Sequence, residues 1–230
     1  MWLGVTDIKK ELKSNLTPYF KEKGFQFKTG IQGASIGYIE KSKSNFAFLF
    51  FNVNSIGKVW VSHMCGYLDK VERTLFSIQL PDKSAQYYYE RPYNTLNHIS
   101  IIENNNFRDR LESDTIYSKE DIHRFCDKII EYMETKGLTF MKRNNSLEKV
   151  YNQIIRNWKN KNLDPISEHQ DNYFKALIIL KLMKDPNIED YKAQFSEKLL
   201  AYRNPEDWLH SFKNLCDLLD SPDFEKEYLI

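Results

Sequence analysis

The sequence SNFAFLFFNVNSIGKVWVSHMCGYLDKVER, residues 44–73, decides the fold that this chain can adopt. It holds an uninterrupted apolar run, the polar turn NSIGK, and a second stretch rich in β-branched and aromatic residues. Two such stretches joined by a short turn are typical of a β-hairpin. Phe48 and Leu49 fall on opposite faces of the first strand, which predicts a central strand covered on both sides, or covered on one side and paired with a partner on the other. After Gly66, charges at helical spacing predict a short helix.

The segments around this hairpin extend it into an antiparallel meander. FQFK, residues 25–28, and SIGYIEKS, residues 35–42, precede it and have the composition of strands. Two further strands are expected after it, at QYYYERPY, residues 86–93, and TLNHISIIE, residues 95–103. The polar run that follows, up to residue 118, is predicted to be a loop.

Helical spacing flanks the predicted sheet on both sides. Residues 5–23 repeat apolar side chains every three or four positions, which indicates an amphipathic helix. Ser118 and Asp121 have the capping-box spacing of a second helix, which Gly137 is predicted to end. We therefore expect a sheet of four to six strands, covered on one face by these two helices.

From residue 146 onward the pattern is helical throughout. Proline-containing signals, which suit the first turn of a helix, separate the apolar repeats. They define four helical segments: SLEKVYNQIIRNWKN, QDNYFKALIILKLMKD, NIEDYKAQFSEKLLAY and NPEDWLHSFKNLCDLLDS. The predicted fold is therefore α+β, with an antiparallel β-meander domain over residues 1–142 and an all-helical C-terminal subdomain over 146–230.

Composition excludes several classes of protein. A chain of 230 residues with 41% hydrophobic and 28% charged side chains can bury a globular core. It has only 8 glycines and neither GxGxxG nor GxxxxGK[ST], so no nucleotide loop is expected. Its longest apolar run, residues 46–51, is far shorter than the roughly 20 residues of a membrane helix. With no leader pattern at its start, the chain is expected to be cytoplasmic and not membrane-bound.

The cysteines and histidines give a weak metal pattern. Cys65, Cys126 and Cys216 lack the spacing of a disulfide framework and are expected to be reduced thiols. His63 with Cys65 on a strand, and His123 with Cys126 on a helix, are weak zinc candidates. Their spacing matches no established metal motif, and buried free thiols are commoner. No metal and no cofactor are therefore assigned.

No catalytic residue is assigned either. The chain has no nucleophile elbow, and pairing Cys65 with His98 would need a contact between strands that spacing does not fix. A hydrolase-type enzyme with a site around His63, Cys65 and His98 stays an alternative to the interpretation that the protein is not an enzyme.

One aromatic string suggests a binding surface. Tyr87, Tyr89, Arg91 and Tyr93 share one face of a predicted strand. Tyrosine with arginine is typical of protein–protein hot spots and of base-stacking platforms, although a half-buried sheet face would have the same composition. A nucleic-acid platform would need a basic surround, which this string lacks. It favours a protein partner or a second copy of the chain.

Charge is distributed unevenly along the chain. Residues 1–60 carry a net charge of +5, residues 61–145 of −1 and residues 146–230 of −3, which gives the formal total of +1. Such asymmetry can steer an oppositely charged partner, although a solvated helix face would also account for it. The Lys-rich residues 9–43 leave a nucleic-acid-associated accessory protein as an alternative function.

The order of elements through YFKEKGFQFK, YIEKSKSNFAFLFFNVN and VWVSHMCGYLDKVERTL resembles the domain-of-unknown-function family numbered 4304 and its relatives. The resemblance covers roughly residues 5–80. Several bacterial domains of this sort are similar to immunity proteins, which neutralise contact-dependent toxins by binding them. The resemblance implies a bacterial, cytoplasmic protein that binds and occludes a protein partner such as a toxin, and it implies no catalytic residues.

Overall fold

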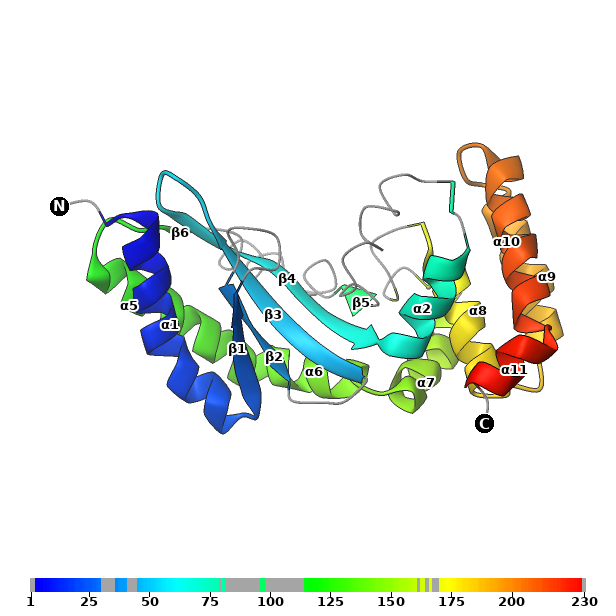
Figure 1. Cartoon of the computed structure of the whole chain (residues 1–230), viewed down its shortest axis with the longest axis horizontal. Coiled ribbons are helices and arrows are strands. Elements are labelled where there is room, and N and C mark those ends of the chain that lie inside the picture. Colours follow the sequence, from blue (N-terminus) through cyan, green and yellow to red (C-terminus); the bar gives the residue numbers. More distant parts are fainter. Residues whose placement is uncertain are drawn as a thin grey trace. The chain divides into compact units, whose positions relative to one another are not determined.

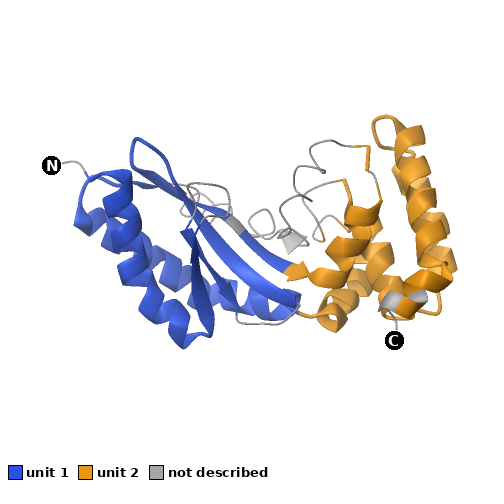
Figure 2. Cartoon of the chain, in the orientation of Figure 1, with its two compact units in different colours: residues 1–66, 97–145 blue, residues 67–96, 146–230 orange. Residues whose placement is uncertain are grey.

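The chain is described from a computed structural model, which covers residues 3–29, 36–40, 45–78, 80–81, 96–97, 114–160, 162–163, 166 and 170–228 (Figure 1). They form an antiparallel sheet with helices, which confirms the predicted α+β class. The chain divides into two compact units, residues 1–66 with 97–145 and residues 67–96 with 146–230 (Figure 2). Each unit has its own hydrophobic core.

The sheet confirms the predicted meander. Its strand order is β1-β2-β3-β4-β5, and β6 pairs with β4. The pairs β1–β2, β2–β3 and β4–β6 are antiparallel. The strands are β1 Phe25–Thr29, β2 Ile36–Glu40, β3 Asn45–Val53, β4 Lys58–Leu68, β5 Leu96–Asn97 and β6 Asp114–Thr115. Of the two late strands expected from the sequence, only Leu96–Asn97 lies within the described residues.

Strand β3 is buried on both faces, as the sequence predicts. Its odd-numbered residues, from Ala47 to Val53, join the core beneath the helices. On the opposite face, Phe48 and Phe50 are only 1% and 3% exposed. Gly37 of β2 lies opposite Phe50, whose ring fills the space that a Cβ at Gly37 would need. This close approach explains a glycine in the middle of a buried strand.

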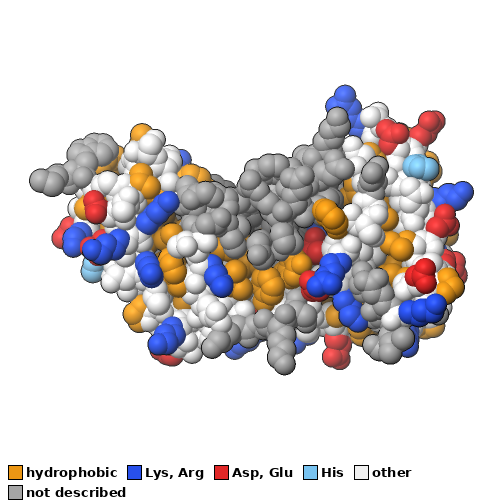
Figure 3. Space-filling view, in the orientation of Figure 1, with side chains coloured by type: hydrophobic (Ala, Val, Ile, Leu, Met, Phe, Trp, Pro, Cys, Tyr) orange, Lys and Arg blue, Asp and Glu red, His pale blue; other side chains and the backbone are white. Residues whose placement is uncertain are grey.

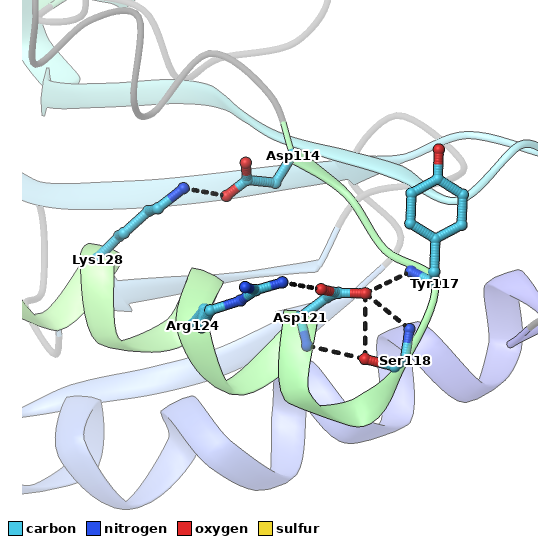
Figure 4. A network of polar contacts seen from close by, with 6 residues as sticks. All are labelled: Asp114, Tyr117, Ser118, Asp121, Arg124 and Lys128. Carbon is cyan, nitrogen blue, oxygen red and sulfur yellow. Dashed lines mark hydrogen bonds and ion pairs between the residues drawn. The ribbon is translucent and has the colours of Figure 1, made fainter.

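Two helices cover one face of the sheet. Helix α1, Val5–Glu22, packs on α5, Lys119–Tyr132, and on strands β1 to β3 (Figure 1). The apolar stripe of α1 is fully buried, as its spacing predicts: Ile8, Leu12, Leu16 and Phe20. The predicted capping box begins α5: Ser118 Oγ accepts a hydrogen bond from Asp121 N (3.2 Å), and Ser118 N donates to Asp121 Oδ2 (2.8 Å; Figure 4).

The predicted helix end at Gly137 is wrong. Helix α5 continues through a π-helical turn, η2 Met133–Gly137, into α6, Leu138–Asn144. Gly137 has the right-handed backbone of a helix interior (φ −61°) rather than the left-handed conformation of a helix-ending glycine. A Cβ at this position would collide with the sulfur of Met133. The glycine therefore makes room inside the turn and does not stop the helix.

The second unit is helical. Helix α8 is its centre, because Phe174 and residues 176–180 are fully buried and α2, α7, α9 and α10 all contact it. The short helix α2, which directly follows β4 in sequence, thus packs with the C-terminal helices. The helices are α2 Asp69–Ser77, α7 Leu147–Lys159, α8 Asn172–Leu182, α9 Ile188–Leu199, α10 Pro205–Leu219 and α11 Pro222–Tyr228. In the part of the chain that the structure describes, no helix is both long and apolar enough to span a bilayer.

Candidate interaction surface

The residues predicted to bind a protein partner lie outside the described residues. This holds for Tyr87, Tyr89, Arg91 and Tyr93, and also for His98. Their roles stay predictions.

The weak zinc candidates on α5 do not converge. His123 is exposed to water, whereas Cys126 is buried in the core of the first unit. Cys65, in β4 with His63, is also buried. Burial raises the pKa of Cys126 to about 12, which keeps its thiol protonated at neutral pH. Among the described residues, no three His, Cys, Asp or Glu side chains form a group that could hold a metal ion.

A buried ion cluster in the second unit was not predicted from the sequence. The Lys175 Nζ of α8 lies 3.3 Å from Glu72 Oε1 of α2 and 3.3 Å from Asp171 Oδ2. All three side chains are almost completely buried. Its only sequence signal is a single cation inside the otherwise apolar stretch YFKALIIL, with Asp171 one turn earlier.

This cluster is arranged for structure rather than for nucleophilic chemistry. Burial by itself lowers the pKa of Lys175, but the carboxylates of Asp171 and Glu72 outweigh it and raise the pKa above the ordinary value of lysine. A lysine that stays protonated is neither a nucleophile nor a general base. The cluster therefore ties α2 to α8 through charge.

The first unit carries a basic surface over α1 and β1. It is formed by Lys9, Lys10, Lys13 and Lys21 of α1 and Lys28 of β1. Figure 3 shows Lys and Arg side chains gathered over these two elements. Across the described ranges, none of these five lysines forms an ion pair. They therefore leave uncompensated positive charge in contact with water.

Two other lysines of the first unit form ion pairs. Lys23 pairs with Glu134 at 2.9 Å, and Lys119 of α5 pairs with Glu11 at 2.8 Å. These two ion pairs tie α1 to α5 and η2. Lys23 and Lys119 thus link structural elements of the first unit, whereas the lysines of the basic surface form no ion pair within the described residues.

Phe27 of β1 lies beside Lys13 of the basic surface. Its half-buried ring meets Tyr38 edge to face at 5.7 Å, and Lys13 Nζ lies 4.5 Å from the ring centroid. This cation–π contact holds the Lys13 ammonium above strand β1. A half-buried aromatic ring beside a cation is a suitable anchor for a protein partner.

A second exposed feature is an apolar tip formed by Ile56 and Tyr117. Ile56, in the β3–β4 turn, is 62% exposed, and Tyr117, just before α5, is 55% exposed. Gly57, with φ of +75°, accepts a hydrogen bond through its carbonyl from Ile116 N at 3.0 Å, which ties the turn to the Tyr117 segment. Figure 4 shows the Tyr117 ring pointing away from the capping contacts of α5. Two large, exposed side chains thus stand on segments that a backbone hydrogen bond joins.

The chain matches no family model, no curated protein and no solved structure. The resemblance of residues 5–80 to the family numbered 4304 therefore stays an expectation.

Proposed function

We propose that this chain is a cytoplasmic protein-binding protein that occludes an acidic protein partner, with an immunity-like role against a toxin as the leading version. The observation that carries this proposal is the basic surface, whose five lysines have no ion-pair partner in the described part of the chain. A charged surface of one sign speeds encounter with a partner of the opposite sign and disfavours wrong partners.

The surroundings of these lysines support a protein partner. Phe27 supplies an aromatic anchor within the basic surface, and the apolar tip of Ile56 and Tyr117 supplies a further apolar contact. Buried aromatic and apolar anchors, rather than charges at the rim, carry most of the affinity of protein interfaces. The Tyr/Arg face of residues 87–93 is proposed as an additional contact.

A nucleic-acid-associated accessory protein is the second candidate, because lysines also neutralise phosphates. The overall charge argues against it. The chain has a formal net charge of +1 and a pI of about 7.7, whereas a nucleic-acid-binding domain is typically basic, with a pI above about 9. Strongly salt-dependent retention on duplex DNA would favour this candidate.

Affinity capture from the source cell tests the proposal. The wild type is compared with Lys13→Glu/Lys28→Glu and with the matched control Lys136→Glu/Lys198→Glu, whose lysines are exposed outside the basic surface. We expect the wild type and the control to retain an acidic protein that the first variant loses. A third variant, Tyr89→Ala/Arg91→Glu, tests the proposed Tyr/Arg contact. A wild type that retains no protein, or equal retention by all variants, contradicts the proposal.

A further inference from the structure

Strand β1 forms one edge of the sheet. It stands at the end of the strand order, and among the described residues its one partner strand is β2, from Phe25 opposite Glu40 to Thr29 opposite Ile36. Counting every described residue, no hydrogen bond beyond this ladder involves the backbone of residues 25–29. Gln26, Lys28 and Thr29 are exposed. The outward N–H and C=O groups of β1 are therefore available to a further strand.

The usual devices that block an edge are scarce in β1. Its sequence FQFKT contains neither proline nor glycine, and its register with β2 runs through all five residues without a bulge. Lys28 is the only charged residue of the strand. A strand that is paired along its whole length on one side, without a bulge, is a template for strand addition on its other side.

The charges around β1 favour an acidic segment over other occupants. Successive side chains of a strand point to opposite faces, so Lys28 lies on one face of the sheet edge, while Lys13 lies over Phe27 on the other. An added strand would therefore run between cations on both of its faces. A second copy of the chain would bring the same lysines together, and like charges oppose cross-strand pairing.

We propose that β1 binds an extended acidic segment of the protein partner by strand addition. Main-chain hydrogen bonds from the β1 edge would supply affinity, and Lys13 and Lys28 would select carboxylates on either face of the added strand. This inference rests on the proposed function and names the mode by which the partner is bound.

Amide hydrogen exchange of the full chain, with and without a strand-forming probe, tests the proposal. The probe is the peptide acetyl-Val-Glu-Val-Glu-Val-Glu-Val-amide at about ten times its dissociation constant. We expect exchange within residues 25–29 to slow about tenfold. The Val-Lys analogue, and the same acidic peptide N-methylated along both edges, should leave exchange in this strand unchanged.

A matched pair of variants tests the role of charge. Lys28→Glu should weaken binding of the acidic peptide about fivefold at low salt, while the control Lys136→Glu leaves it unchanged. Unchanged exchange in β3 shows that each variant keeps its fold.

The possible outcomes separate this inference from the proposed function. Peptide binding without slowed exchange in residues 25–29, or no binding at all, overturns strand addition. Loss of the cellular partner in Lys13→Glu/Lys28→Glu would still support a charge-selected partner in that case. Slowed exchange of the same amides by duplex DNA, and not by the peptide, would assign the edge to nucleic acid and overturn the inference.

Discussion

Replacing Lys175 with methionine should destabilise the second unit strongly at neutral pH. The ammonium lies 3.3 Å from one oxygen of each carboxylate. At an effective dielectric constant of 20, each contact corresponds to about 5 kcal/mol of attraction. The cost of burying the lysine offsets much of this, but methionine removes the cation from beside two buried carboxylates. Breaking a buried ion pair in this way costs about 3–5 kcal/mol.

Protonation of the carboxylates limits that cost and makes it depend on pH. Without Lys175, burial disfavours the charged form of the two carboxyl groups, so the variant gains stability as pH falls and one of them can be protonated. Protonating one such carboxyl costs about 4 kcal/mol at pH 7 but only about 1 kcal/mol at pH 5. We expect the destabilisation to shrink to about 1–3 kcal/mol at pH 5.

The wild type should also lose stability as pH rises, but only in the range where Lys175 itself titrates. The folded-state pKa of Lys175 is raised, so its contribution is complete below the unfolded-state value of about 10.4 and is lost as pH rises through the folded-state value.

Urea unfolding followed by circular dichroism at 222 nm measures these changes, because the second unit is helical. The triple variant Lys175→Met/Glu72→Gln/Asp171→Asn is the control, since it removes the cation and both charges together and should recover part of the lost stability. A Lys175→Met variant as stable as the wild type at pH 7, or one whose stability does not rise toward pH 5, would refute the reasoning.

Three further predictions concern the first unit. Gly37→Ala should lower the free energy of unfolding by about 1–3 kcal/mol in urea titrations, because the new methyl group collides with the Phe50 ring. Cys126, whose pKa is about 12, should react with a thiol reagent at pH 8 only after unfolding, which mass spectrometry of native and urea-treated protein can check. Ile56→Asp should leave thermal stability unchanged but reduce partner capture, since the side chain is exposed; unchanged capture would remove the apolar tip from the interface.

The parts of the fold that sequence predicts well are those with a local cause. The alternation around residues 25–66 and the capping box at Ser118 depend on neighbours in the chain, and the structure confirms both. The predicted helix end at Gly137 is wrong because this glycine packs against Met133 within a π-turn. A glycine that follows a helical pattern ordinarily marks the end of the helix. The helical period alone does not distinguish these two uses.

The charged sites likewise combine features that are visible in the sequence with contacts that depend on the tertiary fold. Lys175 stands out in sequence as a cation within an apolar helix, but its partner Glu72 comes from a distant helix that only the tertiary fold brings near. The positive charge of residues 1–60 is likewise visible in the composition. Which of those lysines are neutralised is decided by contacts such as Lys23 with Glu134, which no local pattern encodes.

The basic charge at the edge of β1 can serve two purposes at once. Lysine on an edge strand is a common device against unwanted pairing, which alone would suggest that β1 is protected rather than receptive. That protection is selective, because it acts through charge: it opposes a second copy of the same basic edge and attracts a strand that carries carboxylates. Specificity is a difference between affinities, and a repulsive element against one partner can be the attractive element for another. The edge of β1 is protected by the charges of Lys28 and Lys13 and has neither a proline nor a bulge. We therefore expect it to accept an acidic segment and to resist self-association.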